Sequence, residues 1–186
     1  MRIPTLGPGT FAGGSTGAVH REAIYANFKN AEASLAIPNG TPAVLVYNGT
    51  DDGLAVVLPS TAGAAKSATL FAGICRAIAG SLPTGVVGDF AVYGLCLTAN
   101  ITVATRSAST VVWPSYAAGA VGDFLALETV GNGLTDLGSA AQTGYGVVAV
   151  LAQAYVSATT LASSIVSGAS TVSFLQLPLK VHLRMM

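Results

Sequence analysis

Charged residues are scarce in this chain of 186 residues. Asp, Glu, Lys and Arg together make up 9% of it, against roughly 25% in ordinary soluble domains. Eight basic and eight acidic residues give a net charge of zero, and no run of Lys or Arg occurs. Because nucleic acid is bound through clustered basic side chains, this composition argues against direct DNA or RNA binding.

Long apolar runs are also lacking, although 52% of the residues are apolar and the mean hydropathy is +0.63. A membrane-spanning helix needs about 20 consecutive apolar residues. The apolar stretch Thr69 to Ile101 is divided by Arg76, Pro83 and Asp89, and the run Tyr145 to Val156 is too short. We expect no membrane-spanning helix and no signal peptide. A strand-based barrel in an outer membrane gives a weak signal and stays an alternative.

Residues that carry catalysis or bind metals are few. The chain has two histidines, His20 and His182, and no His-x-x-x-His, Cys-x-x-Cys or Gly-x-Ser-x-Gly pattern. These gaps argue against a zinc site and against a nucleophile elbow. The segment Gly63–Ser67 lacks the glycines that a phosphate-binding loop requires and is interpreted as an ordinary loop. We therefore expect no catalytic residue, no metal and no cofactor.

Carboxylates stand mainly in turns. Asp51 and Asp52 follow Asn-Gly-Thr, and Asp89 and Asp123 each follow a glycine. The adjacent pair could hold a divalent cation as hard oxygen ligands. Asp side chains also accept hydrogen bonds from nearby turn amides, and this interpretation is favoured at all four positions. A carboxylate pair that forms only in space stays open.

Two cysteines, Cys75 and Cys96, lie in apolar segments that resemble strands. Because no export signal is expected, buried free thiols are favoured over a disulfide between them.

The chain divides into an arm and one domain. Residues 1–18 are rich in Gly and Pro and show no helical or strand period, so they are predicted to form an extended N-terminal arm. Residues 19–186 are predicted to form a single β-rich domain.

Short strands separated by turns dominate the domain. Residues 19–36 fit either a helix or a strand, and strand is favoured. Residues 43–47 and 54–58 are predicted to pair as a hairpin. Further strands are expected within 69–78, 95–98, 101–105, 110–113 and 144–155, and residues 157–171 are expected to be a loop or an insertion.

Two local patterns add detail. Val87-Gly88-Asp89-Phe90 and Val121-Gly122-Asp123-Phe124 form a near-repeat, interpreted as two equivalent Gly-Asp turns that each begin a strand. The last segment alternates Leu177, Leu179, Val181 and Leu183 with Pro178, Lys180, His182 and Arg184. This period of two predicts a strand with one wet face, and its proline indicates an edge or a position near the start. The fold class is therefore all-β, as a β-sandwich or β-barrel of about nine short strands.

Four side chains are candidates for an interface. Phe11 and His20 lie in or beside the arm, and Trp113 and Tyr116 flank Pro114. Aromatic side chains of this kind anchor protein interfaces or sugars, and they also pack in ordinary cores and loops. We assign them to an interface with a partner protein or with another subunit.

The order of several motifs resembles the decoration (cement) proteins of tailed-phage capsids, a small β-rich family commonly described only as a domain of unknown function. The matching motifs run from 24-IYANFKN-30 and 37-IPNGTPAV-44 to 53-GLAVVLP-59 and 70-LFAGI-74. They continue with 88-GDF-90, 92-VYG-94, 118-AGAVGD-123, 144-GYGVV-148 and a final strand with a basic residue, 181-VHLR-184. The resemblance covers residues 22–155 and the last strand.

This resemblance implies a β fold, self-association as a homotrimer, and binding to the major capsid protein on the outside of a virion assembled in the host cytoplasm. It implies no catalytic residues. A neutral chain poor in charge also suits a shell whose surfaces are mutually buried. The alternatives are another virion part, such as a tail or fibre component, and a carbohydrate-binding β-sandwich that uses Trp113 and Tyr116.

Overall fold

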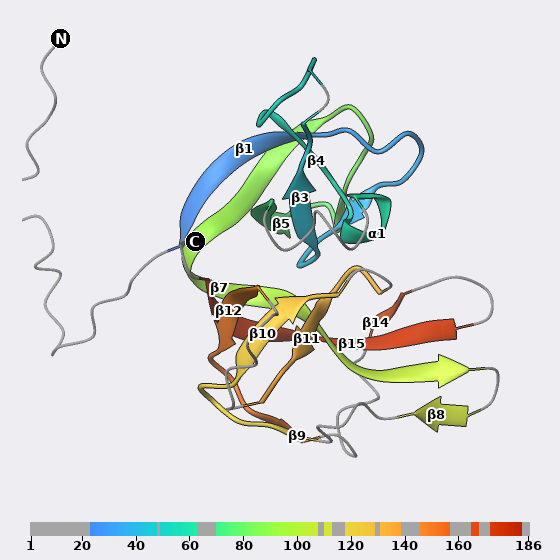
Figure 1. The fold of residues 1–186 in the computed structure, drawn as a ribbon, viewed down its shortest axis with the longest axis vertical. Helices are drawn as coiled ribbons and strands as arrows, with labels where there is room; N and C mark the ends of the chain where they lie inside the picture. Colours follow the sequence, from blue (N-terminus) through green and yellow to red (C-terminus); the bar gives the residue numbers. More distant parts are fainter. Residues whose placement is uncertain are drawn as a thin grey trace, which may run out of the picture.

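The structure is a computed structural model that describes residues 23–47, 49–62, 70–107, 110–112, 118–128, 131–138, 146–156, 165–167 and 172–183. Within them the chain is all-β, as predicted, with fifteen strands and a single one-turn helix. Several strands are only two or three residues long, so the total exceeds the nine expected. Figure 1 shows two lobes, with one long strand, β7, passing through both.

β7 spans Val87–Ser107 and is the longest strand by nine residues. Its first part pairs with β1 (Ile24–Asn30) and β5 (Phe71–Arg76), and its second part pairs with β15 (Val172–Leu183). Gly94, at φ +90°, lies where the strand leaves the first lobe. A glycine takes this left-handed conformation without the steric penalty that a side chain would bring.

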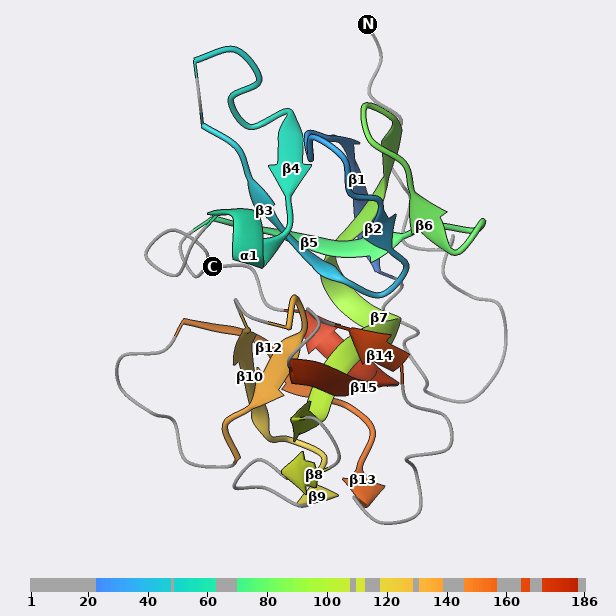
Figure 2. The same ribbon diagram turned by 90° about the vertical axis from the view of Figure 1, so that its right-hand side faces the viewer.

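The first lobe is a closed five-stranded barrel, called here the N-barrel. Its strands follow the order β1, β4 (Ala55–Val57), β3 (Pro42–Leu45), β5 and β7, and β7 pairs back to β1. The β1–β4 ladder is parallel and the other four are antiparallel. A ribbon of β2 (Ile37–Pro38) with β6 (Ser81–Leu82) and the helix α1 (Pro59–Ala62) accompany it. Figure 2 shows these elements above the second lobe.

The second lobe closes in the same way and is called the C-barrel. Its ring runs through β7, β11 (Leu134–Asp136), β10 (Phe124–Leu127), β12 (Val147–Leu151) and β15, which pairs back to β7. The β7–β11 ladder is parallel. A short pair, β9 (Ala118–Gly119) with β13 (Tyr155–Val156), lies at its end. Both lobes therefore correspond to the barrel alternative rather than to a sandwich.

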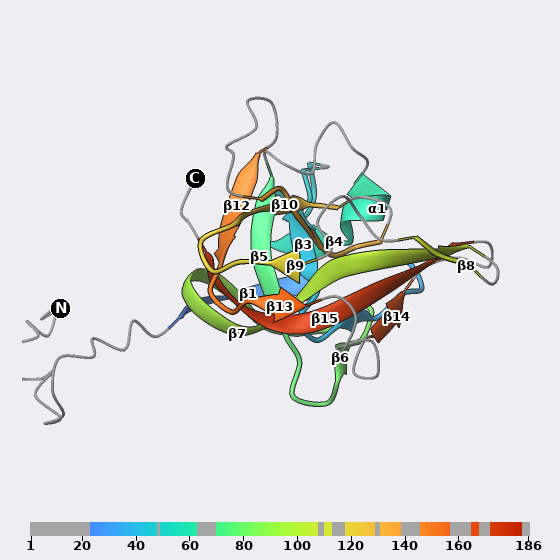
Figure 3. The ribbon, with the colours of Figure 1, turned by 90° about the horizontal axis from the view of Figure 1, so that it is seen from below.

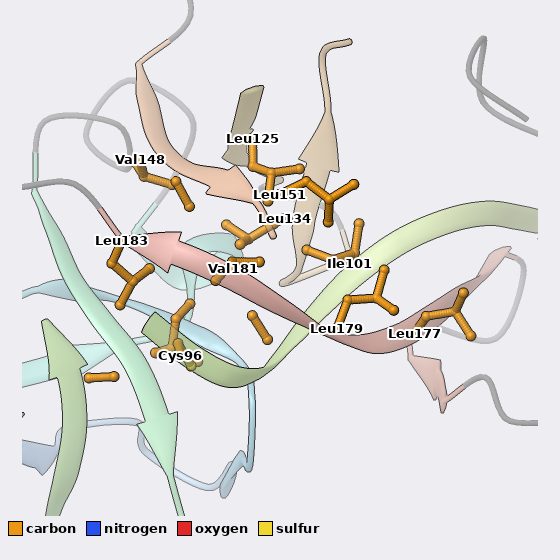
Figure 4. Packing of buried hydrophobic residues seen from close by; sticks show 14 of the residues in the cluster. Cys96, Ile101, Leu125, Leu134, Val148, Leu151, Leu177, Leu179, Val181 and Leu183 are labelled. Carbon is orange, nitrogen blue, oxygen red and sulfur yellow. The ribbon is translucent and has the colours of Figure 1, made fainter. Parts of the chain in front are cut away.

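Side-chain alternation explains how each barrel fills its interior. In β15, Leu177, Leu179, Val181 and Leu183 are buried while Pro178 and Lys180 are exposed, as the sequence predicts. The leucines and valines meet Ile101, Leu125, Leu134, Val148 and Leu151 in the C-barrel core (Figure 4). The N-barrel is filled around Phe90, which meets Phe28 edge to face with ring centroids 5.7 Å apart. Small barrels of this size leave room for side chains alone.

Asn100 of β7 joins the two barrels. Its backbone N–H donates to Gly40 O at 2.8 Å, and its side-chain Nδ2 donates to Asn39 O at 3.1 Å. Asn100 is 2% exposed, so these bonds form in a region of low dielectric. A second link between the lobes is the N–H of Ser60 in α1, which donates to Asn132 Oδ1 at 2.8 Å. The barrels are thus fixed to each other through polar contacts as well as through the shared strand.

Most predicted segments agree with the structure. Residues 24–30 form a strand, as favoured, and the expected hairpin is the antiparallel pair β3–β4. The expected strand within 144–155 is found as β12. The proposed loop or insertion at 157–171 contains the strand β14 (Ile165–Ser167), and its other residues lie outside the described part.

Three predictions need correction. The separate strands expected at 95–98 and 101–105 are parts of the continuous β7, because partners on both sides extend its ladder past Ala99. The two copies of the near-repeat are not structurally equivalent. Gly88 lies inside β7 opposite Phe28, while Gly122 is in a turn at φ +102°. Pro178 is in the middle of β15, between the segments paired with β14 and with β12, and faces Asn100 on its remaining side.

The junction at Gly40 gives a stability prediction. Gly40 has φ +79°, and an added Cβ would lie 2.8 Å from Asn100 Oδ1 and 3.0 Å from Thr98 O. Gly80 has φ +91° with nothing within 4 Å of the same added atom. Both alanine variants carry backbone strain, but only Gly40→Ala also displaces the junction. We expect Gly40→Ala to lower the free energy of unfolding by about 1–3 kcal/mol more than Gly80→Ala, measured by urea denaturation. Equal losses would contradict this role of Gly40.

Candidate docking surface and buried polar sites

The four interface candidates, Phe11, His20, Trp113 and Tyr116, all lie outside the described residues, and so does the loop Gly63–Ser67. Their assignment therefore stays a prediction. The surface that the structure does describe offers a different set of apolar side chains, which sequence analysis did not single out.

Exposed large apolar side chains are numerous on the N-barrel. Among the described residues, eight of the ten come from residues 24–87: Ile24, Tyr25, Leu35, Tyr47, Leu54, Ile78, Val86 and Val87. The other two are Leu97 and Val121. Single exposed apolar residues are normal, but a gathering of them on one part of a molecule marks a surface for a partner.

Four of these side chains surround the end of β1 and form what we call the apolar rim: Leu35, Leu54, Val86 and Val87. The backbone places them there, because Lys29 N–H donates to Leu54 O and Asn30 N–H donates to Val86 O. Val87 pairs with Lys29 across β1 and β7. The buried Asn30 Nδ2 donates to Leu35 O at 3.0 Å and to Leu82 O at 2.9 Å, which fixes the last side of the rim.

The rim lies at the end of the N-barrel that faces away from the C-barrel. Figure 1 shows the far end of β1 and the β3–β4 connection together at the top of the molecule. Leu54 is 71% exposed and Val87 60% exposed. The predicted strand 54–58 begins at Leu54, whereas in the structure Leu54 stands in the turn that precedes β4. In the sequence, the one indication that Leu54 is exposed is its position directly after Gly53. That indication is weak unless the fold is known.

Charges near the rim neutralise each other. Lys29 Nζ lies 3.6 Å from Asp51 Oδ1. Asp52 Oδ1 accepts a hydrogen bond from Gly49 N–H at 2.7 Å, so this carboxylate holds its own turn, as the favoured interpretation of the pair predicts. The rim is therefore available for apolar contact without a strong field of either sign.

A groove of about 500 Å³ lies on the other side of the β3–β4 hairpin. Its lining comes from β3, β4, α1 and the start of β5: Leu45, Val46, Tyr47, Val57, Thr61, Ala62 and Leu70. Tyr47, 58% exposed, connects the groove to the β3–β4 turn, where an added Cβ on Gly53 would lie 3.9 Å from its hydroxyl. The groove and the rim thus meet at one hairpin.

A smaller hollow of about 220 Å³ lies between the two barrels and contains both cysteines. It is lined by Tyr25, Ile74, Cys75, Arg76, Ala91, Cys96, Leu97 and Thr98. The Arg76 guanidinium stands 4.9 Å from the centre of the Tyr25 ring, a cation–π contact at its mouth. Tyr25 of β1 lines one side of the hollow.

The thiols in this hollow are free and buried, which confirms the expectation. Burial raises the pKa of Cys75 to about 12. Burial also raises the pKa of Cys96, while the Thr98 carbonyl, which accepts a hydrogen bond from the thiol, and nearby Arg76 oppose the shift. Since the thiolate is the nucleophile, both groups are poor nucleophiles at neutral pH. They act as small apolar side chains in the two cores.

A buried carboxylate pair does form in space, at the end of the C-barrel. Asp123 and Asp136 are each 7% exposed. Asp123 Oδ2 accepts from Ala120 N–H at 2.7 Å, which confirms its turn role. Asp136 accepts from Gly138 N–H at 2.7 Å and from the Tyr155 hydroxyl at 3.1 Å. Burial raises the pKa of Asp136, and the charge of Asp123 adds to the shift, while the hydrogen bonds from Gly138 and Tyr155 oppose it.

A second buried polar group lies beside β11. The Thr102 hydroxyl donates to Glu128 Oε2, and Gln176 Nε2 donates to Gly131 O at 2.9 Å. Burial raises the pKa of Glu128, and the Thr102 hydrogen bond opposes this. Gln176 thus satisfies a backbone carbonyl of the β10–β11 connection, and Thr102 gives the Glu128 carboxylate a hydrogen bond.

The described residues contain no group of three or more His, Cys, Asp or Glu side chains placed to hold a metal ion. None of their helices is long and apolar enough to cross a membrane. Comparison with protein-family models, with curated proteins and with solved structures found no match to this chain.

The raised pKa of Asp136 predicts a pH dependence of stability. Because the folded pKa lies above the ordinary value of 3.8, the folded state binds this proton more tightly than the unfolded state. The resulting stabilisation is complete below pH 3.8 and is lost as the pH rises through the folded pKa. Asp136→Asn keeps an acceptor for Gly138 and removes the titration. We expect the variant's free energy of unfolding, relative to wild type, to rise between pH 3.5 and 7. A constant difference in urea denaturation across this range would contradict the assignment.

Proposed function

We propose that this chain is a structural virion protein that binds the outer surface of a tailed-phage capsid and stabilises the shell, with no catalytic role. The observation that carries the proposal is the apolar rim at the free end of the N-barrel, in a chain with very little surface charge. Its partner is the major capsid protein, and it acts on the capsid exterior as a homotrimer. The order of motifs shared with decoration proteins supports the same assignment.

The distribution of charge supports a surface that a neighbour covers. Among the described residues, three acidic side chains are buried, namely Glu32, Asp123 and Asp136. Each accepts a backbone hydrogen bond, from Leu58, Ala120 and Gly138 respectively. These carboxylates hold turns together and add little to the field outside. A protein so weakly charged can be packed against a shell, and against its own copies, with little desolvation of charge.

The rim alone is smaller than a standard interface, in which each partner buries about 800 Å². Taking one apolar side chain of this size from full exposure to full burial contributes roughly 1.5–3 kcal/mol, and each rim side chain contributes less because it is already partly covered. Four such residues give a modest affinity for each copy. Multivalent attachment raises the overall affinity without new contacts, because linked copies bind a repeating lattice together. A trimer on a capsid would therefore compensate for the modest affinity that this neutral surface gives each copy. A tail or fibre component is the alternative role.

The rim makes the proposal testable by co-sedimentation with expanded, undecorated capsids of the parent phage. Val87→Asp and Leu54→Asp each place a carboxylate where an apolar contact is expected, and burying an unpaired charge is costly. We expect the apparent Kd for capsids to rise about tenfold or more, since 1.4 kcal/mol corresponds to one factor of ten. Leu54 and Val87 are both more than half exposed in the free protein, so an aspartate at either position should not disturb the fold.

The matched control is Val121→Asp, at a residue that is 66% exposed and lies on the C-barrel away from the rim. It adds the same charge to the same kind of side chain. The control should pellet like wild type. If all three variants bind equally, the rim is not the docking surface, and if wild-type protein does not pellet with capsids, the capsid proposal itself is wrong.

The arm gives a separate prediction. Deleting residues 1–18 leaves β1, which begins at Ile24, and its ladders with β7 and β4 intact. The shortened chain should therefore keep the thermal unfolding midpoint of the full chain. Its capsid binding should weaken, because a Gly-rich arm whose one charged side chain is Arg2 can add contact area along neighbouring subunits. Unchanged pelleting by a folded, shortened chain would remove the arm from the binding surface.

A further inference from the structure

β7 and β15 extend beyond the C-barrel as a ribbon that projects from the molecule (Figures 1 and 3). Here β15 pairs with β7 from Val172 opposite Ser107 to Gln176 opposite Thr102. The strand β8 (Thr110–Val112) joins the outer side of β7, and β14 joins the outer side of β15. The projecting ribbon is therefore a four-stranded antiparallel sheet in the order β8, β7, β15, β14, and Figure 1 shows the four side by side.

The two edges of this ribbon differ from the barrel strands. Each barrel closes on itself, so its strands have neighbours on both sides, and the other open edges among the described residues belong to the two-residue strands of the β2–β6 and β9–β13 pairs. Among the described residues, β8 pairs only with β7, and β14 pairs only with β15. An edge strand presents a row of backbone N–H and C=O groups that can pair with another strand.

The sequence of these edges does not protect them. Monomeric proteins blunt their sheet edges with charges, especially Lys, or with proline. β8 has the sequence Thr-Val-Val and β14 has the sequence Ile-Val-Ser, so neither strand contains a charged residue or a proline. Across the four strand segments of the ribbon, at 102–107, 110–112, 165–167 and 172–176, Arg106 is the one charged residue. Rich in β-branched residues, both edges are suited to strand pairing.

Strand directions show what would pair with them. Adjacent strands of the ribbon are antiparallel, so β8 and β14 run in opposite directions. A second copy in the same orientation brings its β8 alongside β14 of the first copy, and the two strands then run antiparallel. Both are three residues long. Because the chain has no net charge, copies do not repel one another. The chain itself thus supplies a complementary partner for each edge.

Hydrogen-bond geometry adds a detail at β8. Ser107 and Thr110 pair with two residues between them. The residues that flank a two-residue connection normally form a hydrogen-bonded pair, and bonded and non-bonded pairs alternate along an antiparallel ladder. The next pair, Arg106 with Val111, is then non-bonded. Val111 therefore turns its N–H and C=O away from β7, toward the open edge.

We propose that the projecting ribbon is the self-association surface of this protein, with β8 of one copy paired to β14 of the next. The two edges differ, so the contact is head to tail, and such contacts close into rings when the rotation between copies allows it. A ring of three copies leaves no open ribbon edge. This inference concerns purified protein and stands apart from capsid binding, which was assigned to the rim.

The test is disulfide trapping between copies. Val111→Cys is combined in turn with Ile165→Cys, Val166→Cys or Ser167→Cys, so that the exact register does not decide the result. Purified protein is oxidised with copper phenanthroline in air and run on a non-reducing gel. At least one double variant should give covalent dimers and trimers. Wild type is the background control, since Cys75 and Cys96 are 2% and 7% exposed.

The single variants decide the arrangement. Head-to-tail pairing predicts that no single variant is trapped, whereas a dimer of Val111→Cys or of Val166→Cys alone would mean that like edges pair, and it would overturn the proposal. Failure of all double variants would overturn it too.

As a second readout, Val111→Pro removes an outward N–H without breaking the β7–β8 ladder. It should shift the sedimentation coefficient to that of the monomer while the circular dichroism spectrum is kept. An unshifted coefficient would place self-association elsewhere.

Discussion

The shared strand β7 is the constraint on which the rest of the fold depends. It pairs with β1 and β5 in one barrel and with β11 and β15 in the other, so one continuous backbone supplies hydrogen bonds to both rings. Neither ring closes without it, because each depends on β7 for its last ladder. Closure removes edges that would otherwise seek a partner. The projecting ribbon is the place where β7 continues past its barrel.

Where the backbone ladders of β7 end, polar side chains make further hydrogen bonds to neighbouring segments. Asn100 bonds the N-barrel turn at Asn39–Gly40 from within the strand. Thr102, two residues later, reaches Glu128, and Gln176 joins the same region from β15. Asn100, Thr102 and Gln176 are buried and hydrogen-bonded, although Asn100 Oδ1 has no hydrogen-bond partner among the described residues. Hydrogen-bonded polar groups in the interior help to specify one packing. A chain with few charges is thereby left with an outside that is largely neutral.

The division between two barrels separates two kinds of contact. The apolar rim at the far end of the N-barrel offers side chains, led by Leu54 and Val87, while the projecting ribbon beyond the C-barrel offers backbone edges. Side-chain contacts suit a foreign surface whose shape must be matched, and backbone edges suit a second copy whose strands have the same spacing. In our proposal one end of the molecule meets the shell and the other meets its neighbours.

The sequence by itself determined the all-β class, the wet face of β15, the β3–β4 hairpin and the burial of Cys75 and Cys96. Each of these follows from a local period or from turn residues. Tertiary structure alone decided that the strands close into two rings, that β7 runs unbroken past Gly94, and that Asp136 approaches Asp123. These facts depend on pairing between residues far apart in the chain, and a period of two reports which face is buried but not which strand lies alongside. The apolar rim belongs with them, because turn residues such as Leu54 and Val86 are gathered by the closure of the barrel.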